Sequence, residues 1–302
     1  MTQVLETTAL TKRFGKRLAL DAIDLRVEQG TVFGLIGPNG AGKTTTMRLL
    51  LDIIRPTSGS IRVLGEDPKV GGAPLRRRIG FLPGELRLEG RVTGRVLLRH
   101  YAQISGTVAS GTPELLAERL DLDLSRQVRT LSKGNKQKLG VVQAFMHTPA
   151  LLVLDEPTSG LDPLVQQEFL TMVREARDNG QTVLLSSHVL SEIQQAADAV
   201  AILRAGRVVT VSDVESLRAS AVRHVAVTVA DAPAEALRAA FAGDPRLASL
   251  TVAGGERASA SGVLEGDINP FIRALAAFTV VDLRVEEPDL EEAVLGLYAK
   301  QV

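Results

Sequence analysis

Alternation of apolar and charged positions predicts strands in the first part of the chain. From Ile23 to Glu28 the two kinds of residue alternate with period 2, the pattern of a half-buried strand. We therefore expect antiparallel strands over residues 1–30. Short apolar runs predict further strands at Val32–Ile36, Ile61–Leu64, Ile79–Leu82, Leu151–Leu154, Thr182–Leu185 and Ala199–Leu203.

Helical patterns separate these runs. Thr44–Ile54 is predicted to be a helix that ends before Pro56, and residues 86–150, rich in Leu, Arg and Ala, are predicted to be mainly helical. Residues 151–203 return to buried strands that alternate with helices, and Ala205-Gly206 indicates a tight turn. Buried strands separated by helices are typical of a mostly parallel α/β sheet, which is the fold class that we expect.

The composition shifts near residue 216, and a second module is expected beyond it. Its pattern predicts the order strand, helix, strand, strand, helix, strand, which is that of a small ferredoxin-like module. The predicted elements are Val222–Val229, Ala234–Phe241, Ala248–Val252, Gly262–Glu265, Asn269–Ala277 and Val280–Glu286, followed by a final helix at Leu290–Tyr298.

A glycine-rich loop lies between the strand at 32–36 and the helix that follows it. It fits the phosphate-loop pattern G-x-x-x-x-G-K-[ST]. Glycine allows the backbone to approach a phosphate closely, and the helix N-terminus favours the same anion. We predict that Lys43 reaches the β- and γ-phosphates, Thr44 binds Mg²⁺ and Thr45 contacts the α-phosphate. The alternative is a glycine turn before a helix that contains Lys-Thr by chance. The predicted nucleotide-binding residues of the loop are Gly37, Asn39, Gly40, Ala41, Gly42, Lys43, Thr44 and Thr45.

Two carboxylates follow the buried strand at 151–154. The carboxyl end of such a strand is where ligand sites form in open α/β sheets. Asp155 suits a direct or indirect role on Mg²⁺, and Glu156 is placed to orient or deprotonate an attacking water. The alternative is that both residues cap a helix that begins near Pro157, since helix starts favour acids.

Charge and composition exclude several classes of partner. Lys+Arg and Asp+Glu both number 35, so a general electrostatic attraction to nucleic acid or to an anionic membrane is not expected. With no Trp and only two Tyr and eight Phe, stacking on nucleic acid has little support as well. There is no Cys, so disulfides and thiol chemistry are excluded. Neither a signal peptide nor a membrane-spanning run is apparent, so we expect membrane contact only through a partner.

Taken together with a third motif, these segments resemble the nucleotide-binding subunits of ABC transporters over residues 3–215. The motif Leu131-Ser132-Lys133-Gly134-Asn135 is similar to the family's signature sequence. The resemblance implies that Ser132 and Gly134 bind the γ-phosphate of ATP held by an opposite subunit. Lys133 and Asn135 depart from the commonest pattern and resemble a branch linked to multidrug and antibiotic export. Lys133 either adds positive charge near the phosphates or is solvated, the reading that we favour.

Three further residues take their expected roles from this resemblance. Asp162 ends a segment similar to the family's D-loop, and it is also suited to cap the helix that starts near Pro163. His188 matches the switch histidine that contacts the γ-phosphate, and we place it with Glu156 as a catalytic residue. Phe14 matches the aromatic that stacks on adenine, with a core Phe as the alternative.

One position departs from the family pattern. Where a glutamine usually follows the strand at 79–82, this chain has Gly84 and then Glu85. Gly84 has no side chain for Mg²⁺, so either Glu85 or a water takes that place. Residues Leu86–Gln103 are expected to form the surface that meets a membrane partner.

The resemblance implies an ATP-binding cassette of P-loop NTPase fold over 1–216. We expect it to contain a RecA-like core, an antiparallel β subdomain and a helical subdomain at about 86–150, with an accessory α+β module at 217–302. The implied function is that of an ATP- and Mg²⁺-dependent motor subunit of an exporter, working as a dimer with a separate permease on the cytoplasmic side of the membrane. A homodimer is the simplest assembly, and a heterodimer remains open. A nucleotide-gated regulatory module with little hydrolysis is the alternative function.

Overall fold

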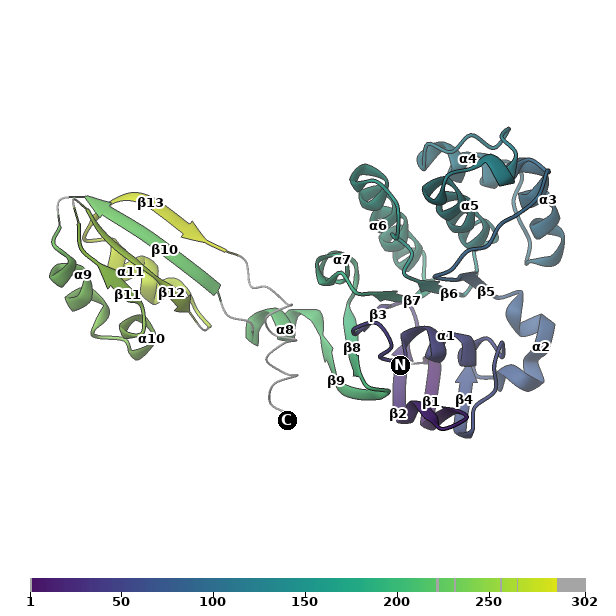
Figure 1. Cartoon of the computed structure of the whole chain (residues 1–302), viewed down its shortest axis with the longest axis horizontal. Coiled ribbons are helices and arrows are strands. Elements are labelled where there is room, and N and C mark those ends of the chain that lie inside the picture. Colours follow the sequence, from purple (N-terminus) through teal and green to yellow (C-terminus); the bar gives the residue numbers. More distant parts are fainter. Residues whose placement is uncertain (1, 221–222, 231, 256, 265, 287–302) are drawn as a thin grey trace. The chain divides into compact units, whose positions relative to one another are not determined.

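The computed structural model describes residues 2–220, 223–230, 232–255, 257–264 and 266–286. The chain divides into two compact units, Met1–Asp213 and Val214–Val302 (Figure 1). Among the described residues, no helix is both long and apolar enough to cross a membrane. The final helix predicted at Leu290–Tyr298 lies outside the described residues.

Two sheets organise the first unit. A small antiparallel sheet has the order β2-β1-β4, and a six-stranded sheet has the order β5-β6-β7-β3-β8-β9. The larger sheet is parallel except at its edge, where β9 runs antiparallel to β8 after the turn at Ala205-Gly206. The mostly parallel α/β fold is therefore confirmed. The strands are β1 (Gln3–Phe14), β2 (Arg17–Glu28), β3 (Val32–Ile36), β4 (Ser58–Val63), β5 (Ile79–Leu82), β6 (Leu151–Asp155), β7 (Thr182–Ser187), β8 (Ala199–Arg204) and β9 (Arg207–Asp213).

Burial explains these strands. Every residue of β3, β6 and β7 is buried, as expected of central parallel strands with both faces covered. The inward residues of β1 and β2 share one hydrophobic cluster with α1 and the neighbouring strands. The phosphate loop leaves the carboxyl end of β3, and β6 and β7 end beside it, so the sheet itself brings the predicted site residues to one edge.

The helices differ from the prediction in places. Helix α1 (Lys43–Leu50) is shorter than predicted, because the backbone turns out of the helix at Asp52, where φ is +54°. Helix α2 (Pro68–Arg76), kinked at Gly72, was not predicted. The other helices are α3 (Gly94–Ile104), α4 (Thr112–Arg119), α5 (Lys133–Phe145), α6 (Pro163–Asp178), α7 (Leu190–Ala196) and α8 (Val214–Ser220), with a 3₁₀ turn η1 at Val128–Thr130.

The second unit is an antiparallel sheet with the order β11-β12-β10-β13. Besides α8, its elements are β10 (Arg223–Ala230), α9 (Ala234–Phe241), α10 (Pro245–Ala248), β11 (Thr251–Ala253), β12 (Ala258–Leu264), α11 (Asn269–Leu275) and β13 (Thr279–Val285). The strand predicted from Ala248 is wrong at its start, because the Asp244 side chain accepts the Arg246 N–H and caps α10 there. One face of the sheet packs on α9 and α11 through Val227, Leu237 and Phe271. Assignment to the ferredoxin-like class stays a prediction.

Candidate nucleotide-binding site

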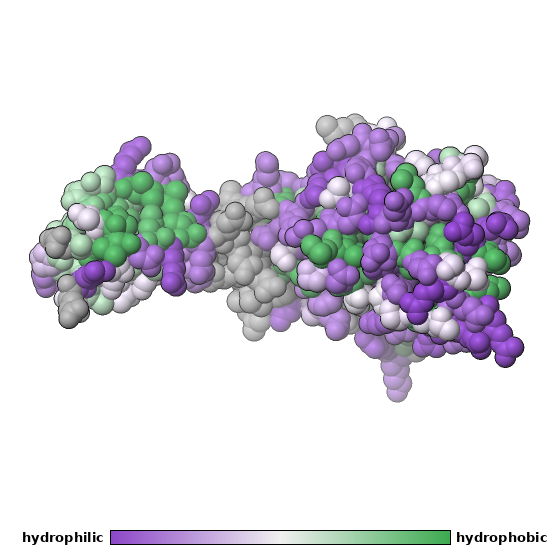
Figure 2. All heavy atoms as spheres, turned by 90° about the horizontal axis from the view of Figure 1, so that it is seen from above, coloured by the Kyte–Doolittle hydropathy of each residue, from purple (hydrophilic) through white to green (hydrophobic). Residues whose placement is uncertain are grey.

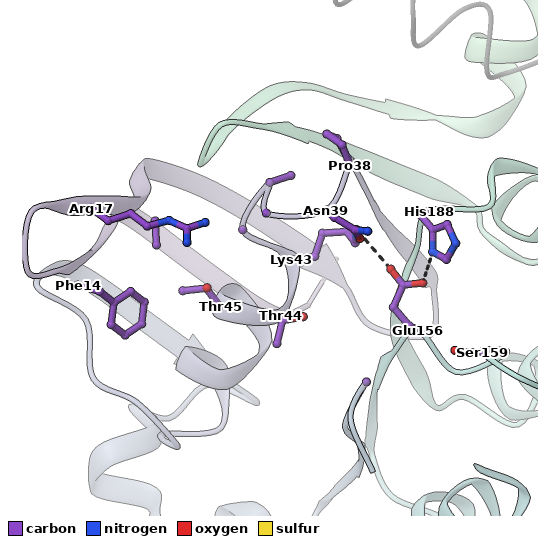
Figure 3. A pocket seen from close by; sticks show the side chains of 15 residues that line it. Phe14, Arg17, Pro38, Asn39, Lys43, Thr44, Thr45, Glu156, Ser159 and His188 are labelled. Atoms are coloured by element: carbon purple, nitrogen blue, oxygen red, sulfur yellow. Dashed lines mark hydrogen bonds and ion pairs between the residues drawn. The ribbon is translucent and has the colours of Figure 1, made fainter. Parts of the chain in front are cut away.

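The carboxyl edge of the large sheet borders a pocket of about 440 Å³ in the first unit (Figure 3). Residues of the phosphate loop line it together with residues of the β1–β2 hairpin and of the segments that follow β6 and β7. The lining residues are Phe14, Arg17, Ala19, Pro38, Asn39, Gly40, Ala41, Gly42, Lys43, Thr44, Thr45, Gly84, Glu156, Ser159 and His188.

The phosphate loop holds Lys43 in a fixed place. The Lys43 ammonium donates to the Gly37 carbonyl oxygen at 2.6 Å and lies 3.3 Å from Glu156 Oε1. Glycine is required at position 37, because a Cβ there would come within 2.4 Å of the Leu203 carbonyl oxygen. Gly37 itself does not line the pocket, so its contribution is to shape the loop and to anchor Lys43.

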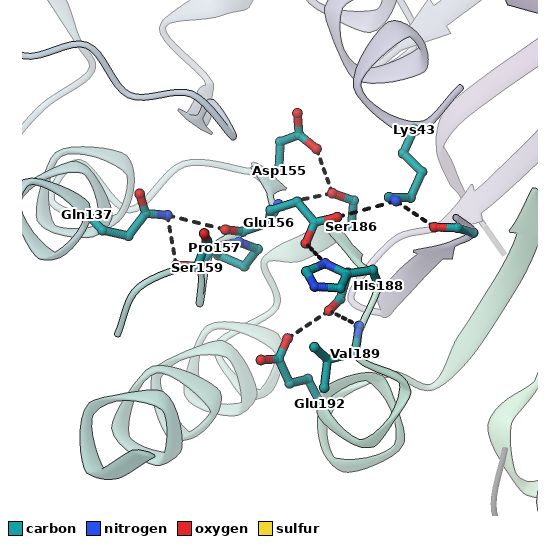
Figure 4. A network of polar contacts seen from close by, with 12 residues as sticks. Lys43, Gln137, Asp155, Glu156, Pro157, Ser159, Ser186, His188, Val189 and Glu192 are labelled. Atoms are coloured by element: carbon teal, nitrogen blue, oxygen red, sulfur yellow. Dashed lines mark hydrogen bonds and ion pairs between the residues drawn. The ribbon is translucent and has the colours of Figure 1, made fainter. Parts of the chain in front are cut away.

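Glu156 has an unusual backbone at the end of β6. Its φ of +49° lies in the left-handed region, which costs a non-glycine residue about 1 kcal/mol or more. The Glu156 N–H donates to Ser186 Oγ at 3.0 Å, and that hydroxyl donates to Asp155 Oδ1 at 2.6 Å (Figure 4). Neighbouring β7 therefore supports the strained turn that directs the Glu156 side chain into the pocket.

His188 meets Glu156 from the end of β7. Its Nδ1 lies 2.6 Å from Glu156 Oε2, while the imidazole is largely exposed. The preceding Ser187 fixes this loop, because its hydroxyl donates to Glu192 and accepts the Val189 N–H. Lys43, Glu156 and His188 thus form one continuous polar chain across the pocket (Figure 4).

Aromatic and cationic side chains of the β1–β2 hairpin form the other end of the pocket. Phe14 is 48% exposed, which rules out the alternative of a core residue. Arg17 pairs with Phe14 across the hairpin, and its guanidinium lies about 3.6 Å from where a Cβ on Gly40 would be. Arg17 was not predicted from the sequence. Its position three residues after Phe14, across the β1–β2 hairpin turn, could have indicated that it lies near the same ligand (Figure 3).

Residues of the signature segment lie outside this pocket. Ser132 caps α5 by accepting the Asn135 N–H at 3.2 Å, and Gly134 packs so closely that a Cβ there would lie 2.6 Å from the Gly160 carbonyl oxygen. Asp162 accepts the Val165 N–H at 3.1 Å, so the predicted capping role is present. Gly134 therefore lies against the D-loop, to which Asp162 belongs, and none of Ser132, Gly134 and Asp162 lines the phosphate-loop pocket of the same chain.

Helix α5 also holds the loop that follows β6. Gln137 is buried and donates to the Glu156 and Pro157 carbonyl oxygens at 3.3 and 2.9 Å. Lys133 is exposed, as favoured, and its ammonium lies 3.4 Å from Ser159 Oγ. Gln137 and Ser186 are supporting residues that pattern reasoning did not find, because they act on backbone groups.

Two oxygen-bearing side chains that could bind a metal lie in or beneath the pocket. Thr44 lines it directly, whereas Asp155 is buried beneath it with one oxygen held by Ser186. Gly84 lines the pocket next to this carboxylate, since a Cβ on Gly84 would lie 3.2 Å from Asp155 Oδ2. Glu85 does not line the pocket and instead pairs with Arg87 at 3.5 Å.

Comparisons with known proteins agree with this geometry. A family profile described as "ABC transporter" matches residues 20–159. The chain is 38% identical over 210 residues to the bacitracin transport ATP-binding protein BcrA of Bacillus licheniformis, covering 68% of this chain and 69% of the relative. It is 39% identical over 213 residues to the daunorubicin resistance ATP-binding protein DrrA3 of Streptomyces coeruleorubidus, covering 69% and 67%.

Solved structures share the fold of the first unit. The structure of an ATP-binding subunit of an ABC transporter matches with a TM-score of 0.66 at 31% identity, over 71% of this chain and 92% of that chain. A dimeric ATP-binding cassette in a post-hydrolysis state bound to ADP and Pi matches with a TM-score of 0.62 over 70% of this chain and 98% of that chain; at 20% identity it supports the fold alone. From its sequence relatives, its fold and its phosphate-loop pocket, the chain belongs to the ABC transporter family as an ATP-binding subunit.

Proposed function

We propose that this chain is the ATP-hydrolysing motor subunit of a membrane exporter. The observation that carries the proposal is the polar chain of Lys43, Glu156 and His188 at the mouth of a phosphate loop. Such a pocket supplies a cation that can bind phosphates, a carboxylate that can act on the attacking water, and an imidazole next to that carboxylate.

Nucleotide binding is divided between the two ends of the pocket. The loop amides from Asn39 to Thr45 and the Lys43 ammonium hold the phosphates. Phe14 stacks on the adenine, a contact worth about 1–3 kcal/mol for a base on an aromatic ring. Arg17 lies between these groups and adds a second cation over the phosphate loop.

Mg²⁺ fits the residues that are present. The Thr44 hydroxyl and the Asp155 carboxylate are the hard oxygen donors that Mg²⁺ prefers, and at nucleotide sites it takes few protein ligands besides phosphate oxygens. Among the described residues, no group of three or more His, Cys, Asp or Glu could hold a metal ion on its own. Mg²⁺ would offset negative charge on the phosphates, with Thr44 binding it directly and Asp155 directly or through water.

Glu156 and His188 act on the water and the terminal phosphate. The Glu156 carboxylate orients or deprotonates the attacking water, because it is the carboxylate that faces the loop. His188 contacts the γ-phosphate from the opposite side of Glu156 and keeps that carboxylate in position.

The proposed dimer rests on family membership and on the place of the signature and D-loop residues. Family membership implies a dimer and a membrane permease partner, and we propose that the dimer is a homodimer. Ser132, Gly134 and Asp162 lie outside the phosphate-loop pocket, so we place them against the ATP held by the second subunit. Closure of two subunits around two ATP molecules, and reopening after hydrolysis, would move the permease.

The class of transport is proposed from the relatives. BcrA and DrrA3 are named for bacitracin transport and daunorubicin resistance, so export of an antibiotic-like compound is the transport that we propose. Residues Leu86–Gln103, which include all of α3 except its last residue, would meet the permease on the cytoplasmic side of the membrane.

The test compares the purified protein with Glu156→Gln. We expect the variant to bind ATP and dimerise stably while phosphate release falls by at least about a hundredfold, as for loss of a general base. If the unaltered protein binds ATP but shows no turnover that depends on Glu156, a nucleotide-gated regulatory module becomes the better account. A Glu118→Gln variant, altered at an exposed position outside the pocket, is the matched control and should keep its turnover.

A further inference from the structure

Strand β13 is an exposed edge of the sheet in the second unit. It pairs with β10 on one side, and on its other side no described strand pairs with it. All seven of its residues are exposed, and its four large apolar side chains, Val280, Val281, Leu283 and Val285, are 37% to 46% exposed. Figure 2 shows hydrophobic surface on this unit bordered by polar residues. Proteins usually blunt such an edge, because it is a template for pairing with another strand.

The free backbone groups of β13 can be assigned. The Glu286 N–H donates to the His224 carbonyl oxygen of β10, and successive residues of a strand point their backbone groups to opposite sides. The N–H and C=O groups of Leu283 and Val285 therefore point away from β10, toward the open edge. A bulge at Val281, the extra residue between the pairs Thr228–Asp282 and Val229–Val280, marks one end of this regular stretch.

The sequence of the edge is self-complementary. When two copies of Val281-Asp282-Leu283-Arg284-Val285 run antiparallel about a two-fold axis at Leu283, Leu283 faces its own copy. Asp282 then faces Arg284 of the second copy, and Val281 faces Val285 of the second copy. Directly opposed residues share a face of the sheet, so the central Leu283 pair lies on one face and both opposite-charge pairs lie on the other. Within one chain, Asp282 and Arg284 already lie 3.7 Å apart and are mostly exposed.

We propose that β13 pairs with β13 of a second copy of this chain and joins the two sheets into one. Leu283 and its copy would exchange both of their N–H···O bonds at the centre, and the flanking charges set the register. This interface does not use nucleotide, so it is separate from closure around ATP and does not depend on the proposed ATPase function. Pairing with a strand of a different protein would need neither the two-fold pattern nor the charge match.

A charge exchange tests the register. In nucleotide-free full-length protein, we expect Asp282→Arg alone and Arg284→Asp alone each to weaken self-association, measured by sedimentation equilibrium, by roughly tenfold, because two opposite-charge pairs become like-charge pairs. Mixing the two single variants should restore association, since each then faces its complement. The double variant Asp282→Arg/Arg284→Asp should also associate like the unaltered chain. Unchanged thermal unfolding of the second unit shows that the variants remain folded.

A covalent test uses the absence of cysteine from the chain. Leu283→Cys would place one thiol opposite its copy, at a Cα separation of about 5.5 Å that a disulfide can span. We expect rapid oxidation to a covalent dimer, and none for Val70→Cys, a control position in the first unit that is more exposed than Leu283. A nucleotide-free protein that stays monomeric, association that ignores both charge variants, or failure of the mixture to recover would each overturn the proposal.

Discussion

Arg17 is the residue that the geometry adds to the nucleotide pocket. Its guanidinium lines the pocket above Gly40, and no ion pair or hydrogen bond holds it among the described residues. A cation without a protein partner beside a phosphate loop is available for the ligand.

We therefore expect Arg17→Ala to weaken ATP binding by about 1 kcal/mol, a roughly fivefold rise in Kd, because a charge-assisted hydrogen bond is lost at an exposed site. Lys16→Ala is the matched control, since Lys16 is an exposed neighbouring cation that does not line the pocket. Titration calorimetry with ATP and AMP would show the effect, which should be smaller for AMP. Equal losses for both Arg17→Ala and Lys16→Ala would assign the effect to general charge.

His147, which lies just after the end of α5, is a buried residue that does not line the pocket. Neither ring nitrogen makes a well-formed hydrogen bond to a described residue. Burial lowers the pKa of His147 from the usual 6.5, and the nearby Ile79 backbone opposes this only in part. The folded protein therefore holds a neutral imidazole.

This burial predicts loss of stability in mild acid. The lowered pKa means that the unfolded chain binds a proton first, so the contribution of His147 is complete above pH 6.5 and is lost as the pH falls from 6.5 through the lowered value. Urea unfolding of the first unit across this range should show the loss in the unaltered chain and less of it in His147→Leu. His100→Leu, at an exposed position, is the control. A pH dependence that His147→Leu leaves unchanged would contradict the assignment.

At the scale of elements, α5 is connected to the catalytic loop through Gln137. Its amide group donates to two carbonyl oxygens of the turn that carries Glu156. A second connection joins the helical layer to the core, because Arg119 of α4 binds Glu168 and Glu175 of α6 at 2.6 to 3.0 Å. The carboxylates raise the pKa of Arg119, so this connection stays charged.

Gln137→Glu keeps the size of the side chain but removes the donor. We expect kcat to fall by about tenfold, because a buried donor lost from two carbonyl groups costs roughly 1–3 kcal/mol and displaces the turn at Glu156. ATP affinity should change by less than about twofold, since Gln137 does not line the pocket. Lys136→Ala, next to it on α5, is the control. A rise in Kd with kcat unchanged would show that Gln137 does not act through the turn.

At the scale of the whole molecule, the two units have separate cores. The candidate nucleotide pocket lies in the first, so nucleotide at a hundred times its Kd should stabilise that unit by about 2.7 kcal/mol and leave the other unaffected. Calorimetry of Glu156→Gln, which avoids turnover, should show one unfolding transition that rises by roughly 5–10 °C and one that does not move. A common shift of both transitions would mean that the units unfold together.

Much of this fold could be predicted, for reasons visible in particular residues. Runs such as Leu151–Leu154 are apolar throughout because both faces of their strands are covered. The phosphate-loop motif is specific, because few other sites combine its glycines with Lys-Thr at the start of a helix. The length of α1 and the start of β11 were harder, since single backbone turns at Asp52 and Asp244 decide them.

The supporting part of the site could not be predicted from one sequence. Ser186 and Gln137 form hydrogen bonds with backbone groups around Glu156. Every residue type carries these backbone groups, so the sequence of the contacted loop does not reveal the partner. The positive φ of Glu156 is likewise set by packing between β6 and β7. Tertiary structure determines these features, whereas the motif residues are fixed by the chemistry they carry.

The ion pair between Lys43 and Glu156 has a consequence for how substrate binding affects the carboxylate. A triphosphate that draws the Lys43 ammonium to itself takes away the cation that neutralises Glu156 Oε1. The carboxylate then loses its ion-pair partner at the moment when a phosphate stands beside it. Release of the Glu156 carboxylate from its ion pair is thereby coupled to binding of the substrate. A nucleotide too short to reach Lys43 would leave the ion pair between Lys43 and Glu156 in place.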